Sequence, residues 1–289
     1  MEEANEAELQ DLRELLRMLG KIDPWIKAVT TDGSSRPWVA DSHSPLSTDD
    51  QRTHPYRLSH RTWMAINVAV DFLHCLRRSL TQELQEGQVQ VHLHSYAQMA
   101  LLRGAVENAC CAVWLLGPTL RLERVTNRLC LEWHELKPAY RLRELAHAQP
   151  TKTIEQRQQQ LIDLLIAANF PFTPRPGEAL QVAAERTARK TLKEGGDYVE
   201  MVKRAGELTP NVGADVAEAT WRMCSALAHG DSSATIGLLD LQIVEQVQPG
   251  INLVLTTPPV RPLVAAAAIA LGLTARAFEL LEIRGRALY

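Results

Sequence analysis

One stretch of this sequence, ADVAEATWRMCSALAHGDSSA from Ala214 to Ala234, holds an arginine and a histidine at a spacing suited to chemistry. On a helix, Arg222 and His229 stand seven residues apart, about two turns, so both side chains project from nearly the same face with Ser225 between them. A permanently charged guanidinium and a ring that titrates near neutral pH together suit phosphate contact and proton transfer. The simpler interpretation is that Arg222 pairs with an acidic neighbour and His229 caps the last carbonyls of the helix.

The residues that follow His229 are of the kind that end a helix. Gly230 predicts the stop, because only glycine enters the left-handed conformation at no steric cost, and Asp231 begins a polar turn. A helix C-terminus favours the protonated form of a histidine by roughly 0.3–1 kcal/mol, and the nearby carboxylate of Asp231 is expected to add to this effect.

A second stretch, HLHSYAQMALLRGAVENACCAVWLLGP, predicts a central helix from about Val91 to Leu116, because apolar residues surround most of its circumference. Arg103 and Glu107 stand one turn apart on it, and Asn108 follows. Charged groups in so apolar a helix need partners, and the Arg222/His229 face is the obvious one. The alternative is a self-contained Arg103–Glu107 ion pair that fixes the register of the helix.

Composition limits the function classes. The chain has 289 residues, 46% of them apolar, and a net charge of −3, which argues against bulk electrostatic attraction to nucleic acid or to an anionic membrane. One local exception is a basic stripe at helical spacing, formed by Arg121, Arg124 and Arg128. It predicts either a solvated helix face or a contact to nucleic-acid phosphates.

The cysteines and the apolar runs predict a soluble, cytoplasmic protein that does not bind a membrane. The N-terminus lacks the basic flank and apolar core of a signal peptide, and no uninterrupted apolar run reaches the ~18–20 residues of a membrane span. We find no Gly-rich phosphate loop and no paired Cys/His spacing, so neither a metal nor a cofactor is expected. Five cysteines without a C-x-x-C pair are expected to be reduced, buried thiols: Cys75, Cys110, Cys111, Cys130 and Cys224.

Periodicity predicts a mainly all-α fold, a helical bundle with a small C-terminal β-hairpin. Residues 1–58 are expected to form an N-terminal helix and an extended arm, anchored by Trp25 and Trp38, or alternatively a flexible link. Residues 59–289 are expected to form the bundle, with the hairpin at about 235–257 and a C-terminal helix after it. The predicted helices are Glu2–Leu19, Ser59–Glu86, Val91–Leu116, Thr119–Ala148, Thr151–Phe170, Ala179–Lys193, Asp197–Leu208 and Pro262–Arg286.

The last helix contains AAIALGLTARA, which superficially matches a helix-turn-helix core with Gly272 at the turn. Glycine is tolerated within an Ala/Leu-rich helix at about 1 kcal/mol, so one continuous helix is the simpler prediction.

The segments LLRGAVENACCAVWLLGP and WRMCSALAHG together resemble the HEPN (higher eukaryotes and prokaryotes nucleotide-binding) superfamily. One helix carries R-x-x-x-E, a later helix ends in S-x-x-x-H-G, and six residues separate Arg222 from His229, within the spacing typical of the family's Arg-to-His motif. The resemblance implies a helical bundle that dimerises, so that two Arg/His pairs form a composite site that cleaves RNA without a metal. Many such proteins are toxins or act in phage defence.

The resemblance also implies roles for individual residues. His229 would act as general acid or base, Arg222 would stabilise charge on the phosphate, and Glu107 would orient one of them. The implied partners are a second copy of the chain, RNA or a nucleotide, and a cognate antitoxin or other protein. Met223 departs from the Asn or Asp of many active members, so the alternative is a non-catalytic nucleotide-binding or protein-interaction bundle with a structural Arg/Glu/His cluster. The catalytic residues expected are Arg222, His229 and Glu107, and the substrate-binding residues are Arg103, Ser225, Asn108 and Asp231.

Overall fold

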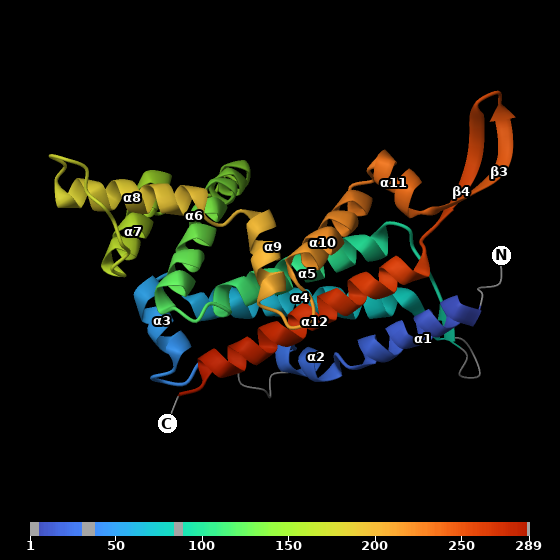
Figure 1. Cartoon of the computed structure of the whole chain (residues 1–289), viewed down its shortest axis with the longest axis horizontal. Helices are drawn as coiled ribbons and strands as arrows, with labels where there is room; N and C mark the ends of the chain where they lie inside the picture. The colour runs from blue at the N-terminus through green and yellow to red at the C-terminus, as the bar shows by residue number, and fades with distance from the viewer. Residues whose placement is uncertain (1–5, 31–37, 84–88, 288–289) are drawn as a thin grey trace.

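The structure, a computed structural model, describes residues 6–30, 38–83 and 89–287, and the chain is mainly α-helical as predicted (Figure 1). The centre of the bundle is formed by α4 (Leu58–Leu80), α5 (Ala97–Leu116) and α12 (Val260–Gly285), which pack along one another. Around this centre lie α1 (Glu6–Gly20), α9 (Tyr198–Glu207) and α10 (Ala214–Ala228). The helix that carries the Arg222/His229 stretch therefore packs directly on the central helix α5.

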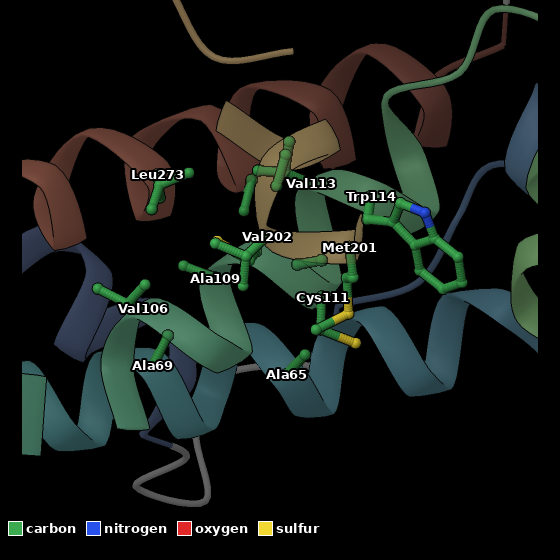
Figure 2. Packing of buried hydrophobic residues seen from close by; sticks show 14 of the residues in the cluster. Ala65, Ala69, Val106, Ala109, Cys111, Val113, Trp114, Met201, Val202 and Leu273 are labelled. Carbon is green, nitrogen blue, oxygen red and sulfur yellow. The ribbon is translucent and has the colours of Figure 1, made fainter. Parts of the chain in front are cut away.

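Small side chains bring α4 and α5 close together. A Cβ atom at Gly104 would lie 2.4 Å from the ring of Phe72, so any larger residue at that point of α5 would require the ring to shift. Figure 2 shows Ala65 and Ala69 of α4 beneath Ala109 of α5 in the same core. Close packing at native density leaves α5 little freedom to move, which makes it a rigid support for the polar groups that it carries.

The N-terminal arm contains two short helices that the sequence pattern did not indicate, α2 (Asp23–Val29) and α3 (Pro45–Thr53). Helix α3 begins where the side chain of Ser44 accepts a hydrogen bond from Ser47 N, with Pro45 in its first turn. Both tryptophans expected as anchors make ring contacts. Trp25 stacks on Phe278 with ring centroids 5.5 Å apart, and Trp38 stacks on Trp63 at 6.1 Å.

Two predicted helix boundaries next to the central helices are wrong. The second helix was expected to reach Glu86, but α4 ends at Leu80 and the chain continues into β1 (Thr81–Glu83), which pairs antiparallel with β2 (Val89–Val91). The third helix begins at Ala97 rather than Val91. The β-branched residues Thr81 and Val91, which face each other across the two strands, favour extended backbone over helix.

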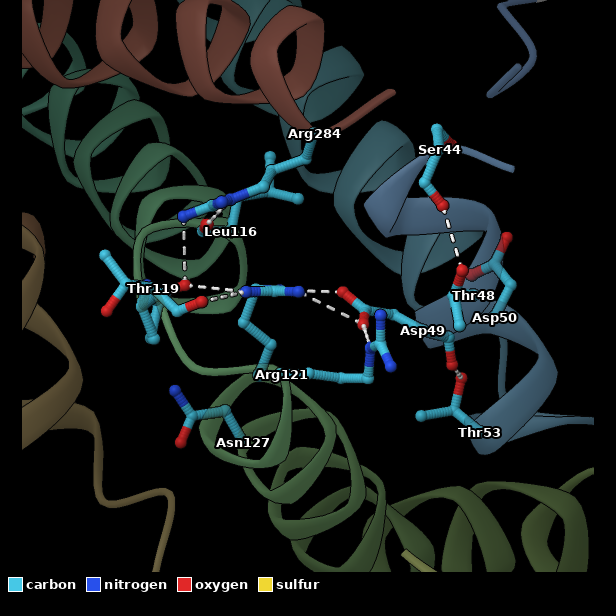
Figure 3. A network of polar contacts seen from close by, with 12 residues as sticks. Ser44, Thr48, Asp49, Asp50, Thr53, Leu116, Thr119, Arg121, Asn127 and Arg284 are labelled. Atoms are coloured by element: carbon cyan, nitrogen blue, oxygen red, sulfur yellow. Dashed lines mark hydrogen bonds and ion pairs between the residues drawn. The ribbon is translucent and has the colours of Figure 1, made fainter. Parts of the chain in front are cut away.

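A second group of helices, α6 (Arg121–Leu145), α7 (Ile154–Ala167) and α8 (Leu180–Glu194), lies to one side of the bundle (Figure 1). The start of α6 is fixed to the arm by a buried ion pair, because Arg124 Nε lies 2.7 Å from Asp49 Oδ2 and both side chains are nearly inaccessible. Arg124 Nη1 also donates to the carbonyls of Pro118 and Thr119. Figure 3 shows this network, with Arg121 beside Asp49.

The basic stripe is therefore not an exposed phosphate-binding face. Arg124 and Arg128 are 2% and 5% exposed, and Arg128 Nη2 donates to Glu132. The predicted solvated or nucleic-acid-binding face is wrong for these two residues, because both turn inward to carboxylates: Arg128 to Glu132 one turn later on α6, and Arg124 to Asp49, which helical spacing alone does not reveal. Only Arg121 remains half exposed, at 49%.

The predicted C-terminal hairpin is present, with β3 (Asp240–Gln248) antiparallel to β4 (Ile251–Thr257) and Gly250 at positive φ in the turn. It extends away from the helices, and its residues are almost all exposed (Figure 1). Its predicted start near Thr235 is wrong, because residues from Ser232 to Leu238 form a short helix, α11.

Helix α12 runs unbroken through Gly272, as the continuous-helix prediction required and the helix-turn-helix pattern did not. By length and composition alone, α5 and α12 are both long and apolar enough to cross a membrane. The relevant window of α5 is 72% buried and that of α12 is 44% buried, and both helices contribute to the central core, a position that also requires apolar sequence.

Candidate functional site

His229 stands at the end of α10 in a well-formed helix cap. Gly230 has φ +66°, and its N–H donates to the carbonyl of Leu227 while the N–H of Asp231 donates to that of Ala226. This pair of bonds is the Schellman motif, in which a left-handed glycine satisfies the last carbonyls of the helix. The predicted stop at Gly230 is confirmed, and the cap leaves the His229 side chain exposed at a fixed point.

The arginine that contacts His229 comes from the central helix. Arg103 Nη1 of α5 lies 2.7 Å from His229 Nε2 of α10. A guanidinium can only donate, so Nε2 accepts this hydrogen bond and the neutral ring carries its proton on Nδ1. The two stretches singled out in the sequence therefore meet in space.

The carboxylate of Glu107 fixes the position of the Arg103 side chain. Its Oε1 accepts one hydrogen bond from Arg103 Nε at 2.9 Å and another from the indole Nε1 of Trp221 at 2.8 Å. One carboxylate oxygen thus joins α5 to α10 and fixes the plane of the guanidinium. The predicted i, i+4 pair of Arg103 and Glu107 is present, and it is not self-contained.

The cluster is open to solvent. The side chains of Arg103 and Glu107 are 28% and 23% exposed, and His229 is exposed. Within the part of the chain that the structure describes, Arg103 Nη2 has no hydrogen-bond partner. The site therefore offers an anion one free N–H edge of a guanidinium, next to a ring nitrogen that can accept a proton.

Arg222 does not share this site. Its Nε donates to Glu218 one turn earlier on α10 at 2.7 Å, its side chain is 59% exposed, and its guanidinium lies 5.9 Å from the ring of Trp221. The structure thus has the simpler arrangement foreseen for Arg222, a pair with an acidic neighbour. It does not have the expected contacts of Glu107 with Arg222 or His229, because Arg103 and Trp221 occupy that carboxylate.

The other expected binding residues are close in sequence but are mostly engaged elsewhere. Ser225 is half-buried on α10, and its carbonyl accepts the N–H of His229. Asn108 Nδ2 donates to the carbonyl of Gly104 on α5. The Asp231 carboxylate accepts from Ala234 N as the N-cap of α11, and the expectation that it would act on His229 gains no contact.

Trp221 is the site residue that sequence reasoning missed. Its indole N–H is a donor that must find an acceptor when the ring is packed against a neighbouring helix. The sequence does contain a signal for it. Helix α5 has a single carboxylate, and a tryptophan on the facing side of α10 needs an acceptor for its indole N–H.

Four of the five cysteines are buried thiols. Cys110, Cys111, Cys130 and Cys224 are buried, as predicted, and burial raises the pKa of the Cys224 thiol to about 12. Cys75 is exposed, contrary to the prediction, because it lies on the outward face of α4 between Leu73 and Leu76, which point into the core. Among the described residues, no group of three or more His, Cys, Asp or Glu side chains could hold a metal ion.

The chain matches no family model, no curated protein and no solved structure. Function is therefore inferred from the residues of the chain alone. The arrangement of Arg103, His229 and Glu107 can bind an anion at a half-exposed guanidinium and move a proton at the adjacent ring nitrogen.

Proposed function

We propose that the protein is a HEPN-like, metal-independent ribonuclease in which His229 and Arg103 are the reacting pair. The observation that carries the proposal is the 2.7 Å contact between the exposed ring of His229 and a guanidinium aligned by Glu107. The R-x-x-x-E helix and the S-x-x-x-H-G helix end, on which the resemblance rests, contribute these three residues. Arg103 takes the place that the sequence pattern gave to Arg222.

The reaction would be attack of a ribose 2′-oxygen on the adjacent phosphorus. An entering phosphate takes the Nη1 and Nη2 donors of Arg103, which releases His229 Nε2 to accept the 2′-hydroxyl proton. The new oxygen–phosphorus bond forms as the bond to the 5′-oxygen breaks, leaving a 2′,3′-cyclic phosphate and a 5′-hydroxyl. Arg103 stabilises the added negative charge, while its Nε stays bonded to Glu107.

A second acid is needed to protonate the leaving 5′-oxygen. In a homodimer the second copy of His229, in its protonated form, can give its proton to this oxygen and become neutral, as the family resemblance implies. Arg222, more than half exposed beside the site, would hold a neighbouring phosphate of the same RNA strand.

The hairpin supports the homodimer. It is exposed on both faces, and an isolated two-stranded hairpin is marginally stable in water. Strand β4, INLVLTT, carries no charge, whereas β3 carries Asp240 and Glu245. Antiparallel pairing of β4 with β4 of a second copy would set the two β3 strands ~14 Å apart. Salt screens repulsion between exposed charges beyond ~8–10 Å, so the acids of the two β3 strands would repel each other little. Pairing through β3 would place the two acid-bearing strands only ~5 Å apart.

The dimer is tested by sedimentation of Leu253→Lys, a β4 residue that is 52% exposed, against Val244→Lys on β3, which is 61% exposed. We expect the first variant to be monomeric and the second to remain dimeric. A monomeric wild-type chain, or equal behaviour of the two variants, would refute pairing through β4.

The cleavage itself is tested with labelled RNA in EDTA. We expect wild-type protein to cut, and His229→Ala and Arg103→Ala to lose activity by at least 100-fold, an effect typical of removing a transition-state donor. His94→Ala is the matched control, because His94 is exposed and its side chain has no hydrogen-bond partner among the described residues. Cleavage that persists in both site variants would refute the assignment.

A second candidate is a non-catalytic bundle in which the same cluster only fixes packing. It is favoured by the bonds that already satisfy Glu107 Oε1 from two helices. A folded wild-type protein that leaves RNA intact, and that loses stability in Arg103→Ala, would support this candidate.

A further inference from the structure

A cavity of about 910 Å³ lies between the arm, α3 and the first turns of α4, and it shares no residue with the proposed active site. Its size is within the range of small-molecule binding sites. Three kinds of lining residue distinguish it: basic side chains, tryptophans and an asparagine.

Three basic or titratable side chains line one side, and the structure gives none of them a partner. His54, Arg57 and His60 are exposed at the junction of α3 and α4, with no side-chain hydrogen bond or ion pair among the described residues. The carboxylate that lines the same cavity, Asp50, is already occupied, because it accepts from both the backbone N–H and the hydroxyl of Ser59. Arg57 and the two histidines therefore give the cavity hydrogen-bond donors that suit an anion.

Two tryptophans give the cavity an apolar surface. Trp63 lines the cavity beside Trp38 of the arm, with the two indole planes 22° apart. On α4, His60, Trp63 and Asn67 fall at helical spacings of three and four residues, so one helix face presents all three to the cavity. Indole faces of this kind favour stacking of a planar ring.

Asn67 has an unmet hydrogen-bonding requirement. Its amide oxygen is buried and has no partner, and no hydrogen bond to its amide nitrogen is found among the described residues. Buried polar atoms are nearly always paired, so the unpaired Asn67 amide is a candidate partner for a ligand that enters the cavity. An asparagine amide can pair in two-pronged fashion with the N–H and ring nitrogen of adenine.

We propose that this cavity binds an adenine nucleotide, with the base on Trp63, its edge on the Asn67 amide and its phosphate on Arg57 and His60. The site stands apart from RNA cleavage, and it holds whether or not His229 is catalytic. Its position where the arm meets α4 means that occupancy would strengthen the attachment of the arm to the bundle.

The test is calorimetric titration of the full chain with adenosine monophosphate, adenosine and inorganic phosphate. We expect the monophosphate to bind at least tenfold more tightly than either fragment, and Arg57→Gln and Asn67→Leu each to weaken it about tenfold or more. Arg78→Gln is the matched control, an exposed arginine at the other end of the same helix. His229→Ala should bind normally, which separates this site from the proposed active site.

Several results would overturn the proposal. If the folded protein did not bind the nucleotide at millimolar concentration, the cavity would not be a nucleotide site. Affinity unchanged in both Arg57→Gln and Asn67→Leu places the nucleotide elsewhere. If inorganic phosphate bound as tightly as adenosine monophosphate, the base would make no contact. If adenosine bound as tightly as the monophosphate, the phosphate would make none.

Discussion

Two arginine–carboxylate pairs in this bundle, Arg124 with Asp49 and Arg103 with Glu107, have almost the same chemistry and opposite surroundings. Arg124 is 2% exposed, and all three of its nitrogens bond to Asp49 or to backbone carbonyls. The Arg103 side chain is 28% exposed and has a histidine as its second acceptor, and one of its nitrogens has no partner among the residues that the structure describes. We call the Arg124–Asp49 pair closed, because every nitrogen of its guanidinium is hydrogen-bonded, and the Arg103–Glu107 pair open, because one nitrogen lacks such a bond within the described part of the chain.

The surroundings of each pair decide whether it can bind a ligand. A buried ion pair must be fully hydrogen-bonded to offset the loss of hydration, and it then has no capacity left for a ligand. A half-exposed pair loses less hydration, so one donor can remain available to a substrate. An unused donor marks a candidate functional arginine only where it is exposed, because the buried Arg128 also keeps two nitrogens unpaired among the described residues.

The largest expected effect is at the closed pair. Asp49→Ala leaves the buried Arg124 charge without its partner and should lower the free energy of unfolding by about 3–5 kcal/mol, measured by urea denaturation. Glu144→Gln, in an exposed i, i+3 pair with Arg141, should change it by less than about 1 kcal/mol. A loss at Asp49 as small as that at Glu144 would contradict the contrast.

At the open pair the effect should fall on activity rather than stability. Arg103→Ala should reduce RNA cleavage by about 10²–10³-fold while the free energy of unfolding falls by about 1 kcal/mol or less, because the site is partly hydrated. Cleavage and urea denaturation measured on the same preparation give both values. A stability loss as large as that of Asp49→Ala would place Arg103 with the structural arginines.

Buried and exposed thiols should also differ in how they make the stability of the fold depend on pH. Burial raises the pKa of Cys224 to about 12, so the folded state keeps a proton that the unfolded chain releases above about pH 8.5. Stability should therefore fall as pH rises through this window, with about 1.4 kcal/mol per pH unit from Cys224. In Cys224→Ala the slope should be shallower by that amount, whereas Cys75→Ala, at an exposed position, should leave it unchanged.

The smallest effect concerns Asp231. As the N-cap of α11 it should contribute about 1 kcal/mol to stability, and Asp231→Ala should lose that amount with RNA cleavage nearly unchanged. Asp231→Asn, which can still cap, should restore stability. If cleavage fell in both variants, the carboxylate would belong to the reaction after all.

The parts of the fold that follow local rules could be predicted from the sequence. Apolar periodicity located α5 and α10, Gly230 located the helix end, and the turn at Pro249-Gly250 located the hairpin. Helix α3 could not be found in this way, because its polar sequence PLSTDDQRT is helical through the Ser44 cap and the burial of Leu46 against other elements.

The candidate site was predicted in part, for a similar reason. His229, Glu107 and Arg103 come together as the sequence suggested, because each lies on a strongly predicted helix. The choice of arginine could not be predicted, since Arg222 has Glu218 one turn away on its own helix. The inward turn of Arg124 depends on Asp49, 75 residues earlier, and no local pattern reports a partner at that distance.

The packing of α1 against α12 has a consequence for how the chain folds during its synthesis on the ribosome. Arg261 bonds to Asp11 across 250 residues of chain, and Leu15 and Leu19 are fully buried in the finished fold. At ~5–20 residues synthesised per second, the first helix waits ~12–50 s for the last. During that interval its apolar stripe lacks the helix that covers it in the finished fold.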